Sequence, residues 1–305
     1  MSVGALACDV AATSERRSAV PSTGGNVSAG GIASGGAPTS AGAAATQGEI
    51  PAAAGGVGNG GTPTTAGSGP SEPFTLSWQD DFDTLDASRW ALQTFSFDGN
   101  LAQFSTKNAS VTNGILSIAL TPEPTDDAKP YRGVELRSIP TITYGKVEAR
   151  IRFAKGAGVV SSLVLIYTPW PADDWNEIDI EHLGKQADNV QLNCLVYKGA
   201  PTTPPVTTSV SPTQDPQMAP LGFDAEADFH VYAMEWTPSS VRFTADGALL
   251  RSWSSEVSRM KLPQNILLTI WASNAPSWAG AVGPDSAPTT ADVDWIKVYS
   301  FNQGG

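Results

Sequence analysis

The sequence has few cysteines and histidines and no long apolar run. Its two cysteines are Cys8 and Cys194, and Cys8 lies in a segment with hardly any large apolar residue, so a disulfide framework is excluded. The two histidines are His182 and His230. No residues have zinc-ligand spacing and no Gly-x-Ser-x-Gly segment occurs, which argues against a metal site and a serine hydrolase. No stretch reaches the ~18 consecutive apolar residues of a membrane-spanning helix.

Positive charge is also scarce. The chain has 18 Lys and Arg against 30 Asp and Glu, which gives a formal net charge of −12. Nucleic acids and anionic membrane surfaces would repel a protein of this sign. No phosphate-binding glycine loop lies between a predicted strand and a helix. A neutral polymer, such as a polysaccharide, remains an acceptable partner.

Large apolar residues are nearly absent from the first part of the chain. Residues 1–72 consist mainly of Gly, Ala, Ser, Thr and Pro, and such a segment buries too little surface to offset its ordering entropy. We therefore predict a disordered linker over residues 1–72. All nine tryptophans lie beyond it, so we predict one folded domain over residues 73–305.

The residues before Cys8 leave two interpretations open. Ala5-Leu6-Ala7-Cys8 resembles the end of a bacterial lipoprotein signal, in which the cysteine is lipidated, although Ala5 stands where Leu is usual. The first eight residues are too short for a complete signal peptide. In one interpretation the chain is an envelope protein anchored through Cys8; in the other, Cys8 is an ordinary small residue of the tail. We expect a secreted or cell-envelope protein that is monomeric.

Period-two alternation replaces any helical period beyond residue 73. Residues 146–153 are the clearest case, with charged side chains on one face and apolar ones on the other. Asn113-Gly114 and Asp246-Gly247 predict tight hairpin turns. The strands expected on this basis are 109–112, 115–120, 229–236, 241–244, 248–253, 266–271 and 293–299. Many short antiparallel strands predict an all-β sandwich or barrel.

Residues 175–184, Trp-Asn-Glu-Ile-Asp-Ile-Glu-His-Leu-Gly, carry three carboxylates at alternate positions. On a strand, Glu177, Asp179 and Glu181 share one face and neighbours lie roughly 6.6 Å apart along the backbone. At that spacing each negative charge raises the pKa of the next carboxyl. The opposite face carries isoleucines and His182, which we expect to be a hydrogen-bonded core histidine.

Three carboxylates on one strand suit a retaining glycosidase. That reaction needs an ionised carboxylate to attack the anomeric carbon and a protonated carboxyl to protonate the leaving oxygen, about 5–5.5 Å apart. The backbones of Glu177 and Glu181 are roughly 13 Å apart on an extended strand, so their side chains must lean together over Asp179. Trp175 is expected on the same face, where an indole can stack on a sugar. The alternative is a solvent-facing strand with acidic decoration.

From about residue 74 to residue 301 the chain resembles glycoside hydrolase family 16, and within it the bacterial lichenases, which are endo-β-1,3-1,4-glucanases. The resemblance rests on residues 175–184, on Leu-Gly-Phe-Asp-Ala-Glu-Ala-Asp-Phe-His-Val-Tyr-Ala-Met-Glu-Trp at 221–236, and on Gly-Val-Val-Ser-Ser at 158–162. It implies a jelly-roll sandwich of two antiparallel sheets with a concave glycan-binding cleft. It also implies a nucleophile at Glu177, an assisting carboxyl at Asp179 and an acid/base at Glu181, with no cofactor for the chemistry.

The resemblance extends to several substrate-binding positions. Residues 134–138, Val-Glu-Leu-Arg-Ser, resemble a family segment in which Glu135 and Arg137 would contact sugar hydroxyls; the alternative is a surface ion pair. Gln191 and Asn193 match a Gln-x-Asn strand beside the catalytic one, or else face solvent. Two tryptophans resemble a floor residue near the scissile bond and a neighbouring loop residue, or else belong to the core: Trp271 and Trp278.

Several departures leave the chemistry intact but bear on the substrate. His182 replaces a usual Phe, Thr269 replaces a frequent Asn, and residues 198–220 are long and rich in proline, which predicts a surface loop. Asp294 resembles a position where some members bind a structural calcium, a site that needs several further oxygen donors.

We predict retaining, endo-acting hydrolysis of a β-glucan with β-1,3-1,4 or β-1,3 linkages, through a covalent glycosyl-enzyme intermediate. One alternative is a transglycosylase, which passes the same intermediate to another sugar. The other is a non-catalytic carbohydrate-binding module, for which loss of a catalytic carboxylate is expected, whereas this chain keeps all three.

Overall fold

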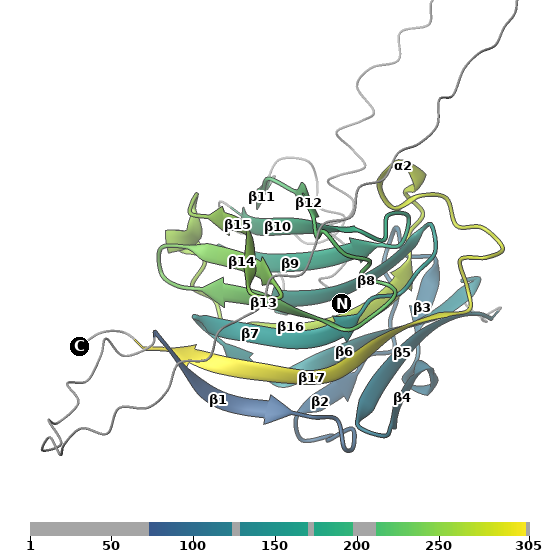
Figure 1. Cartoon of the computed structure of the whole chain (residues 1–305), viewed down its shortest axis with the longest axis horizontal. Coiled ribbons are helices and arrows are strands. Elements are labelled where there is room, and N and C mark those ends of the chain that lie inside the picture. The colour runs from purple at the N-terminus through teal and green to yellow at the C-terminus, as the bar shows by residue number, and fades with distance from the viewer. Residues whose placement is uncertain (1–72, 124–128, 170–173, 198–211, 303–305) are drawn as a thin grey trace, which may run out of the picture. The chain divides into compact units, whose positions relative to one another are not determined.

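The computed structural model describes residues 73–123, 129–169, 174–197 and 212–302. The predicted linker over residues 1–72 lies outside them. The described chain forms two packed, mainly antiparallel sheets (Figure 1), in agreement with the predicted all-β jelly-roll sandwich. The helical segments are short: η2 (Thr106–Asn108), η3 (Val257–Arg259) and α2 (Pro276–Ala279).

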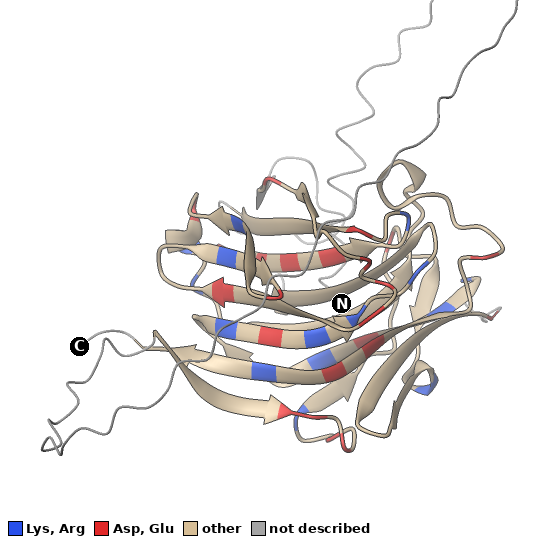
Figure 2. Ribbon diagram, in the orientation of Figure 1, with Lys and Arg blue, Asp and Glu red and all other residues tan. Residues whose placement is uncertain are grey.

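The first sheet, called the β7 sheet here, has β17 and β7 at its centre. Its strands are β1 (Phe74–Asp80), β17 (Thr289–Phe301), β7 (Gly145–Arg152), β13 (His230–Trp236), β14 (Val241–Ala245) and β15 (Ala248–Trp253), with β5 (Ile115–Pro122) and β4 (Ala109–Thr112) paired to the start of β17. The face of this sheet that is turned away from the β9 sheet carries alternating charges (Figure 2). Many of these charges are paired, such as Arg152 with Asp292 at 2.5 Å. This is the wet face that the alternation over residues 146–153 predicts.

The second sheet, called the β9 sheet here, carries the acidic strand near its centre. Its strands are β2 (Trp90–Leu92) and β3 (Ala102–Phe104) beside β6 (Tyr131–Ile142), followed by β16 (Gln264–Ala272), β8 (Val159–Ile166), β9 (Asn176–Leu183), β10 (Asn189–Tyr197), β11 (Pro212–Thr213) and β12 (Gln217–Pro220). Among the paired strands only β3 runs parallel to its neighbour, β6.

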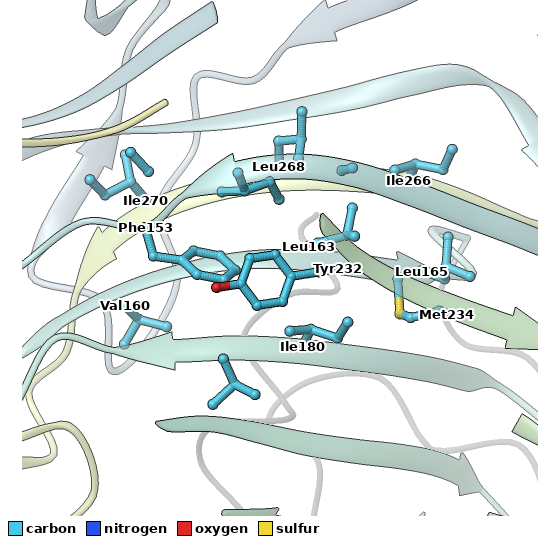
Figure 3. Packing of buried hydrophobic residues seen from close by; sticks show 14 of the residues in the cluster. Phe153, Val160, Leu163, Leu165, Ile180, Tyr232, Met234, Ile266, Leu268 and Ile270 are labelled. Atoms are coloured by element: carbon cyan, nitrogen blue, oxygen red, sulfur yellow. The ribbon is translucent and has the colours of Figure 1, made fainter. Parts of the chain in front are cut away.

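The core lies between the two sheets. One buried residue from each of five adjacent strands of the β9 sheet forms a row in register: Leu192, Ile180, Leu163, Leu268 and Leu136. Tyr232 of the β7 sheet and Phe153, just beyond β7, lie among these residues (Figure 3). Full burial of each aliphatic side chain contributes roughly 1.5–3 kcal/mol, so this row fixes which face of β9 is turned away from the core.

The predicted hairpin turns are confirmed. Asn113 and Gly114 have φ angles of 52° and 75°, and Asp246 and Gly247 have 46° and 77°. Two successive positive φ values define the turn type whose twist matches that of antiparallel strands, and Asn, Asp and Gly tolerate it best. These turns join β4 to β5 and β14 to β15.

The prediction of an irregular loop over residues 198–220 is wrong for its last part. β12 pairs with Asn189–Leu192 of β10, and β11 pairs with the end of the same strand. The prolines of these short strands, Pro212 and Pro220, stand at strand ends, where a missing N–H costs little. Residues 198–211 lie outside the described residues.

Candidate active site

The β9 sheet turns two polar rows away from the core. In the first row Gln191, Glu181, Ser162, Thr269 and Glu135 pair in register across β10, β9, β8, β16 and β6. Directly paired residues project to the same side, so these five side chains line one surface. The neighbouring row contains Asn193, Asp179, Val164, Leu267 and Arg137 in the same strand order.

A small cleft of about 40 Å³ opens on this surface. Glu177 and Glu181 both line it, so the structure brings the two predicted catalytic glutamates to one cavity. Ile178 and Ile180 are fully buried in the core on the other face of β9, as the alternation predicts. The remaining lining residues are Phe97, Phe104, Glu135, Ser162, Val164, Ile166, Leu267, Thr269 and Trp271.

Burial dominates the electrostatics of the three carboxyls. Glu177 and Asp179 are only 5% and 2% exposed. Burial, and then the charge of Glu181, raises the pKa of Glu177 to about 8. Burial raises the pKa of Glu181 to about 7. The pKa of Asp179 lies well above its usual range because of burial and of the flanking charges on Glu177 and Glu181.

A hydrogen bond between Asp179 and Glu177 separates their roles. It lowers the pKa of Glu177 and raises that of Asp179, so Asp179 is the partner that keeps the proton and donates it. Glu177 is then the first of the two to ionise, although burial still holds its pKa at about 8. Its Oε2 atom is buried and has no hydrogen-bond partner among the described residues. A buried, unpaired carboxylate oxygen is costly, and such atoms mark functional sites.

Glu135 and Arg137 lie together at one side of the cleft. Arg137 donates to Oε1 of Glu135 from Nε at 3.1 Å and from Nη2 at 2.5 Å. Glu135 is only 2% exposed, so the pair differs from the solvent-facing ion pair that was the alternative. Burial raises the pKa of Glu135, and the charge of Arg137 opposes this shift.

Gln191 and Asn193 each hold a partner at the opposite side. Nε1 of Trp278 donates to Oε1 of Gln191 at 2.5 Å, and Nδ2 of Asn193 donates to Oε1 of Gln214 at 3.2 Å. The Trp278 ring lies 5.8 Å from that of Trp271, which lines the cleft. The structure thus groups four predicted substrate-binding residues around Glu181 and Asp179.

Trp175 is placed differently from the sequence-based prediction. The indole is fully buried, and its Nε1 donates to the backbone oxygen of Tyr167. Its neighbours form a second apolar cluster, made of Val164, Ile166, Tyr197 and Leu267. Stacking of a sugar on Trp175 has no support here, because these side chains cover the ring.

The sequence analysis did not assign seven further cleft-lining residues to the site: Phe97, Phe104, Ser162, Val164, Ile166, Leu267 and Thr269. Ser162 and Thr269 share a hydrogen bond of 2.6 Å between their hydroxyls, midway between Glu181 and Glu135. Phe97 and Phe104 lie far from β9 in the sequence. The ring of Phe97 packs edge-on against that of Trp271, with the ring centroids 5.1 Å apart. Only the departure at Thr269 was visible beforehand.

The expected calcium position near Asp294 is not confirmed. Asp294 forms an ion pair with Arg150, so its carboxylate is already matched by a cation. The described residues contain no group of three or more His, Cys, Asp or Glu side chains arranged to hold a metal.

Both histidines lie outside the cleft. His182 is fully buried and hydrogen-bonded, as expected for a core histidine. Nδ1 of His230 lies 2.7 Å from Oδ2 of Asp246, and its ring stacks on Phe223. No described helix is long and apolar enough to cross a membrane.

Known proteins are similar to this chain in sequence and in fold. The model of glycosyl hydrolases family 16 matches residues 97–297. A β-glucanase of Fibrobacter succinogenes is 34% identical over 182 residues, which are 58% of this chain and 49% of that relative. A β-glucanase of Brevibacillus brevis is 28% identical over 230 residues, 74% of this chain and 82% of the relative.

Solved structures of β-glucanases are also similar to this chain. A prokaryotic β-1,3-1,4-glucanase (lichenase) from a mouse hindgut metagenome superposes with a TM-score of 0.64 at 28% identity, over 74% of this chain and 99% of that one. The β-glucanase of Bacillus licheniformis gives 0.63 at 25% identity, over 76% and 100%. The family match covers more than half of the chain and contains the three carboxyls of β9, so the protein is a glycoside hydrolase and belongs to glycosyl hydrolases family 16.

Proposed function

We propose that the chain is a retaining, endo-acting β-glucanase that cuts β-1,3-1,4 or β-1,3 linkages. The observation that carries this proposal is the single cleft lined by Glu177 and Glu181, with a hydrogen-bonded Asp179 between them on the same strand. The β-glucanases among its relatives supply the substrate class.

In the first step an ionised Glu177 oxygen bonds to the anomeric carbon. Glu181 gives its proton to the glycosidic oxygen, and the bond between that oxygen and the anomeric carbon breaks. In the second step Glu181 takes a proton from water, whose oxygen bonds to the same carbon and releases Glu177. Asp179 keeps its own proton through both steps and donates a hydrogen bond to Glu177. This hydrogen bond stabilises the Glu177 carboxylate when it is released from the sugar.

The surrounding side chains suit a neutral sugar chain. Glu135 and Arg137 on one side, and Gln191 and Asn193 on the other, supply donors and acceptors for hydroxyls, while Trp271 supplies an apolar ring. Protein sites for sugars combine such polar groups with aromatic faces. We assign these five residues to substrate binding.

The finer expectations about location belong to the same proposal. We propose an exported, monomeric enzyme, anchored through a lipid on Cys8 and held away from the membrane by residues 1–72. Support comes from the sequence before Cys8 and from the composition of residues 1–72. Labelled palmitate in cells producing the parent and Cys8→Ala tests the anchor, and light scattering tests the oligomeric state.

Product analysis tests the activity. Incubation with barley β-glucan, laminarin, xyloglucan, agarose and chitin oligomers should release oligosaccharides from the first or second substrate only. Proton NMR should show the β-anomer as the first product, because two displacements retain configuration. An α-anomer would contradict the nucleophile, products longer than the substrate would indicate transglycosylation, and cleavage of none of the five would remove the proposal.

A further inference from the structure

His182 lies directly behind the proposed acid/base residue. It follows Glu181 on β9 and points into the core, where its ring is fully buried. Nδ1 lies 3.0 Å from the backbone oxygen of Asn189, and Nε2 lies 3.1 Å from Oε1 of Glu226. Phe153 stacks on the ring, with centroids 5.3 Å apart and planes 12° from parallel. Both ring nitrogens therefore face oxygen atoms.

These contacts fix the number of protons. A backbone carbonyl oxygen only accepts hydrogen bonds, so Nδ1 carries a proton. The contact between Nε2 and Glu226 also needs one, since an unprotonated imidazole nitrogen and a carboxylate both only accept. A second proton therefore lies between Nε2 and Oε1 of Glu226, and the two side chains form a hydrogen-bonded pair.

The pair ties a connecting segment to the back of the catalytic strand. Glu226 belongs to residues 221–229, which lead from β12 into β13. Backbone bonds of 2.8 Å from Leu221 to Asp188 and from Ala225 to Ala187 hold the same segment against the turn after β9. His182 and Glu181 are consecutive residues of one strand, with side chains on opposite faces. A shift of His182 therefore also moves Glu181.

Among the described residues, charged groups lie near Glu226: the Asp224 carboxylate accepts a hydrogen bond of 2.9 Å from the backbone N–H of Glu226. The Glu226 carboxylate lines a cavity of about 550 Å³, distinct from the catalytic cleft, together with Arg152 and Lys155. Arg152 is itself paired with Asp292. Phe153, just beyond β7, stacks on the His182 ring and packs in turn against Tyr232 of the β7 sheet. The cavity gives Glu226 its contact with solvent, while the imidazole has none.

We propose that His182 is a positioning residue for Glu181: as an imidazolium bound to Glu226 and to the Asn189 carbonyl, it sets the place from which Glu181 delivers its proton. The proposal rests on the proposed glycosidase function. A displaced acid lowers the rate of bond cleavage only for substrates whose leaving group needs a proton. The effect on catalysis must therefore depend on the leaving group, which a general loss of stability would not produce.

Nitrogen NMR tests the protonation state directly. The chain has two histidines, so a protein labelled with ¹⁵N-histidine gives two ring systems, and His182→Phe identifies them by loss of one. At neutral pH both nitrogens of His182 should be protonated in the full-length parent protein. Glu226→Leu, if it removes the partner without unfolding the chain, should leave only one protonated. A neutral ring in the parent would overturn the proposal, whatever the enzyme's activity.

Kinetics test the positioning role. The variants are His182→Phe, Glu226→Leu and Glu226→Gln, whose amide still donates to a neutral Nε2. The substrates are β-glucan and an aryl β-oligoglucoside whose phenolate leaves without a proton. His182→Phe and Glu226→Leu should lower kcat on β-glucan by about tenfold to a hundredfold, the loss expected for a catalytic group misplaced by about 1 Å. On the aryl substrate both should stay within about threefold of the parent, and KM should change little.

Glu226→Gln should restore most of the β-glucan activity that Glu226→Leu loses. Equal losses on both substrates would mean a purely structural role, and no loss on either would mean no role; both results overturn the proposal. If His182→Phe does not fold, the two Glu226 variants still decide the question. A parent inactive on every glucan would instead refute the proposed function, and the NMR result would remain valid.

Discussion

At the scale of single residues, burial and one hydrogen bond decide the order in which the carboxyls of β9 lose their protons. Removal from water raises the pKa of all three, and the hydrogen bond from Asp179 makes Glu177 the first of that pair to ionise, although its pKa is still about 8. Titration in such a cluster belongs to the group, so each role depends on the other two residues. The active form, with Glu177 ionised and Glu181 protonated, should therefore be most populated between about pH 7 and 8.

Glu177→Gln keeps the size of the side chain and removes the attacking oxygen. We expect kcat on β-glucan to fall at least about a thousandfold, as for other lost nucleophiles. The melting temperature should stay the same or rise, because a buried charge next to two carboxyls is lost. Glu235→Gln, which removes a charge paired with Arg242 on the β7 sheet, is the control and should keep full activity. A tenth of the parent rate in Glu177→Gln would exclude this nucleophile.

The pH dependence should report Glu181. This residue must be protonated to act as the acid, and burial raises its pKa to about 7. Glu177 must be ionised at the same time, and its pKa is raised to about 8, so activity on β-glucan should be highest between about pH 7 and 8, with a rise on the acid side and a decline on the alkaline side. Rates measured between pH 5 and 9 check this, with an aryl substrate as comparison, since its loss should be smaller. Glu181→Ala should lack the decline and regain turnover with azide; an unchanged profile in this variant would assign the decline to another group.

Some site residues could be predicted from the sequence and others could not. Alternation is a local property, so it placed Glu177, Asp179 and Glu181 on one face correctly. The same rule put Trp175 beside them, but side chains from neighbouring strands decide whether a ring is covered. Phe97 and Phe104 reach the cleft only because distant segments meet there, and no local pattern reports that meeting.

At the scale of elements, the register of the paired strands determines which side chains face the core and which face the cleft. The buried row from Leu192 to Leu136 and the polar row from Gln191 to Glu135 lie on opposite faces of the same five strands. A slip of β9 by one residue would exchange Ile180 with Glu181 and bury the acid. The hydrophobic row is therefore what presents the catalytic carboxyls to the cleft.

Leu163→Ala tests the contribution of this row. Leu163 is fully buried between its neighbours on β9 and β16, so the variant should lose about 2–5 kcal/mol of unfolding free energy. Leu249 on β15 is 54% exposed, and Leu249→Ala should change stability by less than about 0.5 kcal/mol. Denaturant unfolding measures both. Similar values for the two variants would contradict the assignment of the core face.

Elements at the sheet edge were the least predictable. Proline in residues 212–220 favoured an irregular loop, yet β12 adds to β10 because partnering needs only alternate N–H groups. A short edge strand with proline at its end satisfies both rules. Composition reports the cost of each proline, whereas the benefit of pairing depends on a neighbouring strand that composition does not show.

At the scale of the whole molecule, charge is balanced locally despite the net value of −12. Cations on the β7 sheet are matched by acids on the same strand, such as Lys146 with Glu148, or on an adjacent one, such as Arg242 with Glu235 (Figure 2). Each exposed pair contributes little to stability, but together they keep the sheet face soluble. No described surface has an unbalanced positive stripe that would attract a polyanion.

The boundary between linker and catalytic domain gives the last prediction. Every residue of the described core lies beyond residue 73, and β1 begins at Phe74, which pairs with Phe301. Removal of residues 1–72 should therefore leave the melting temperature and kcat/KM on soluble β-glucan unchanged. Removal of residues 1–80 is the control: it deletes β1 and the 2.8 Å hydrogen bond from Trp90 to Asp80, so it should lower the melting temperature by several degrees. Equal melting temperatures for both truncations would mean that β1 is dispensable, and a loss already at residue 72 would mean that the domain begins earlier than its hydrophobic pattern indicates.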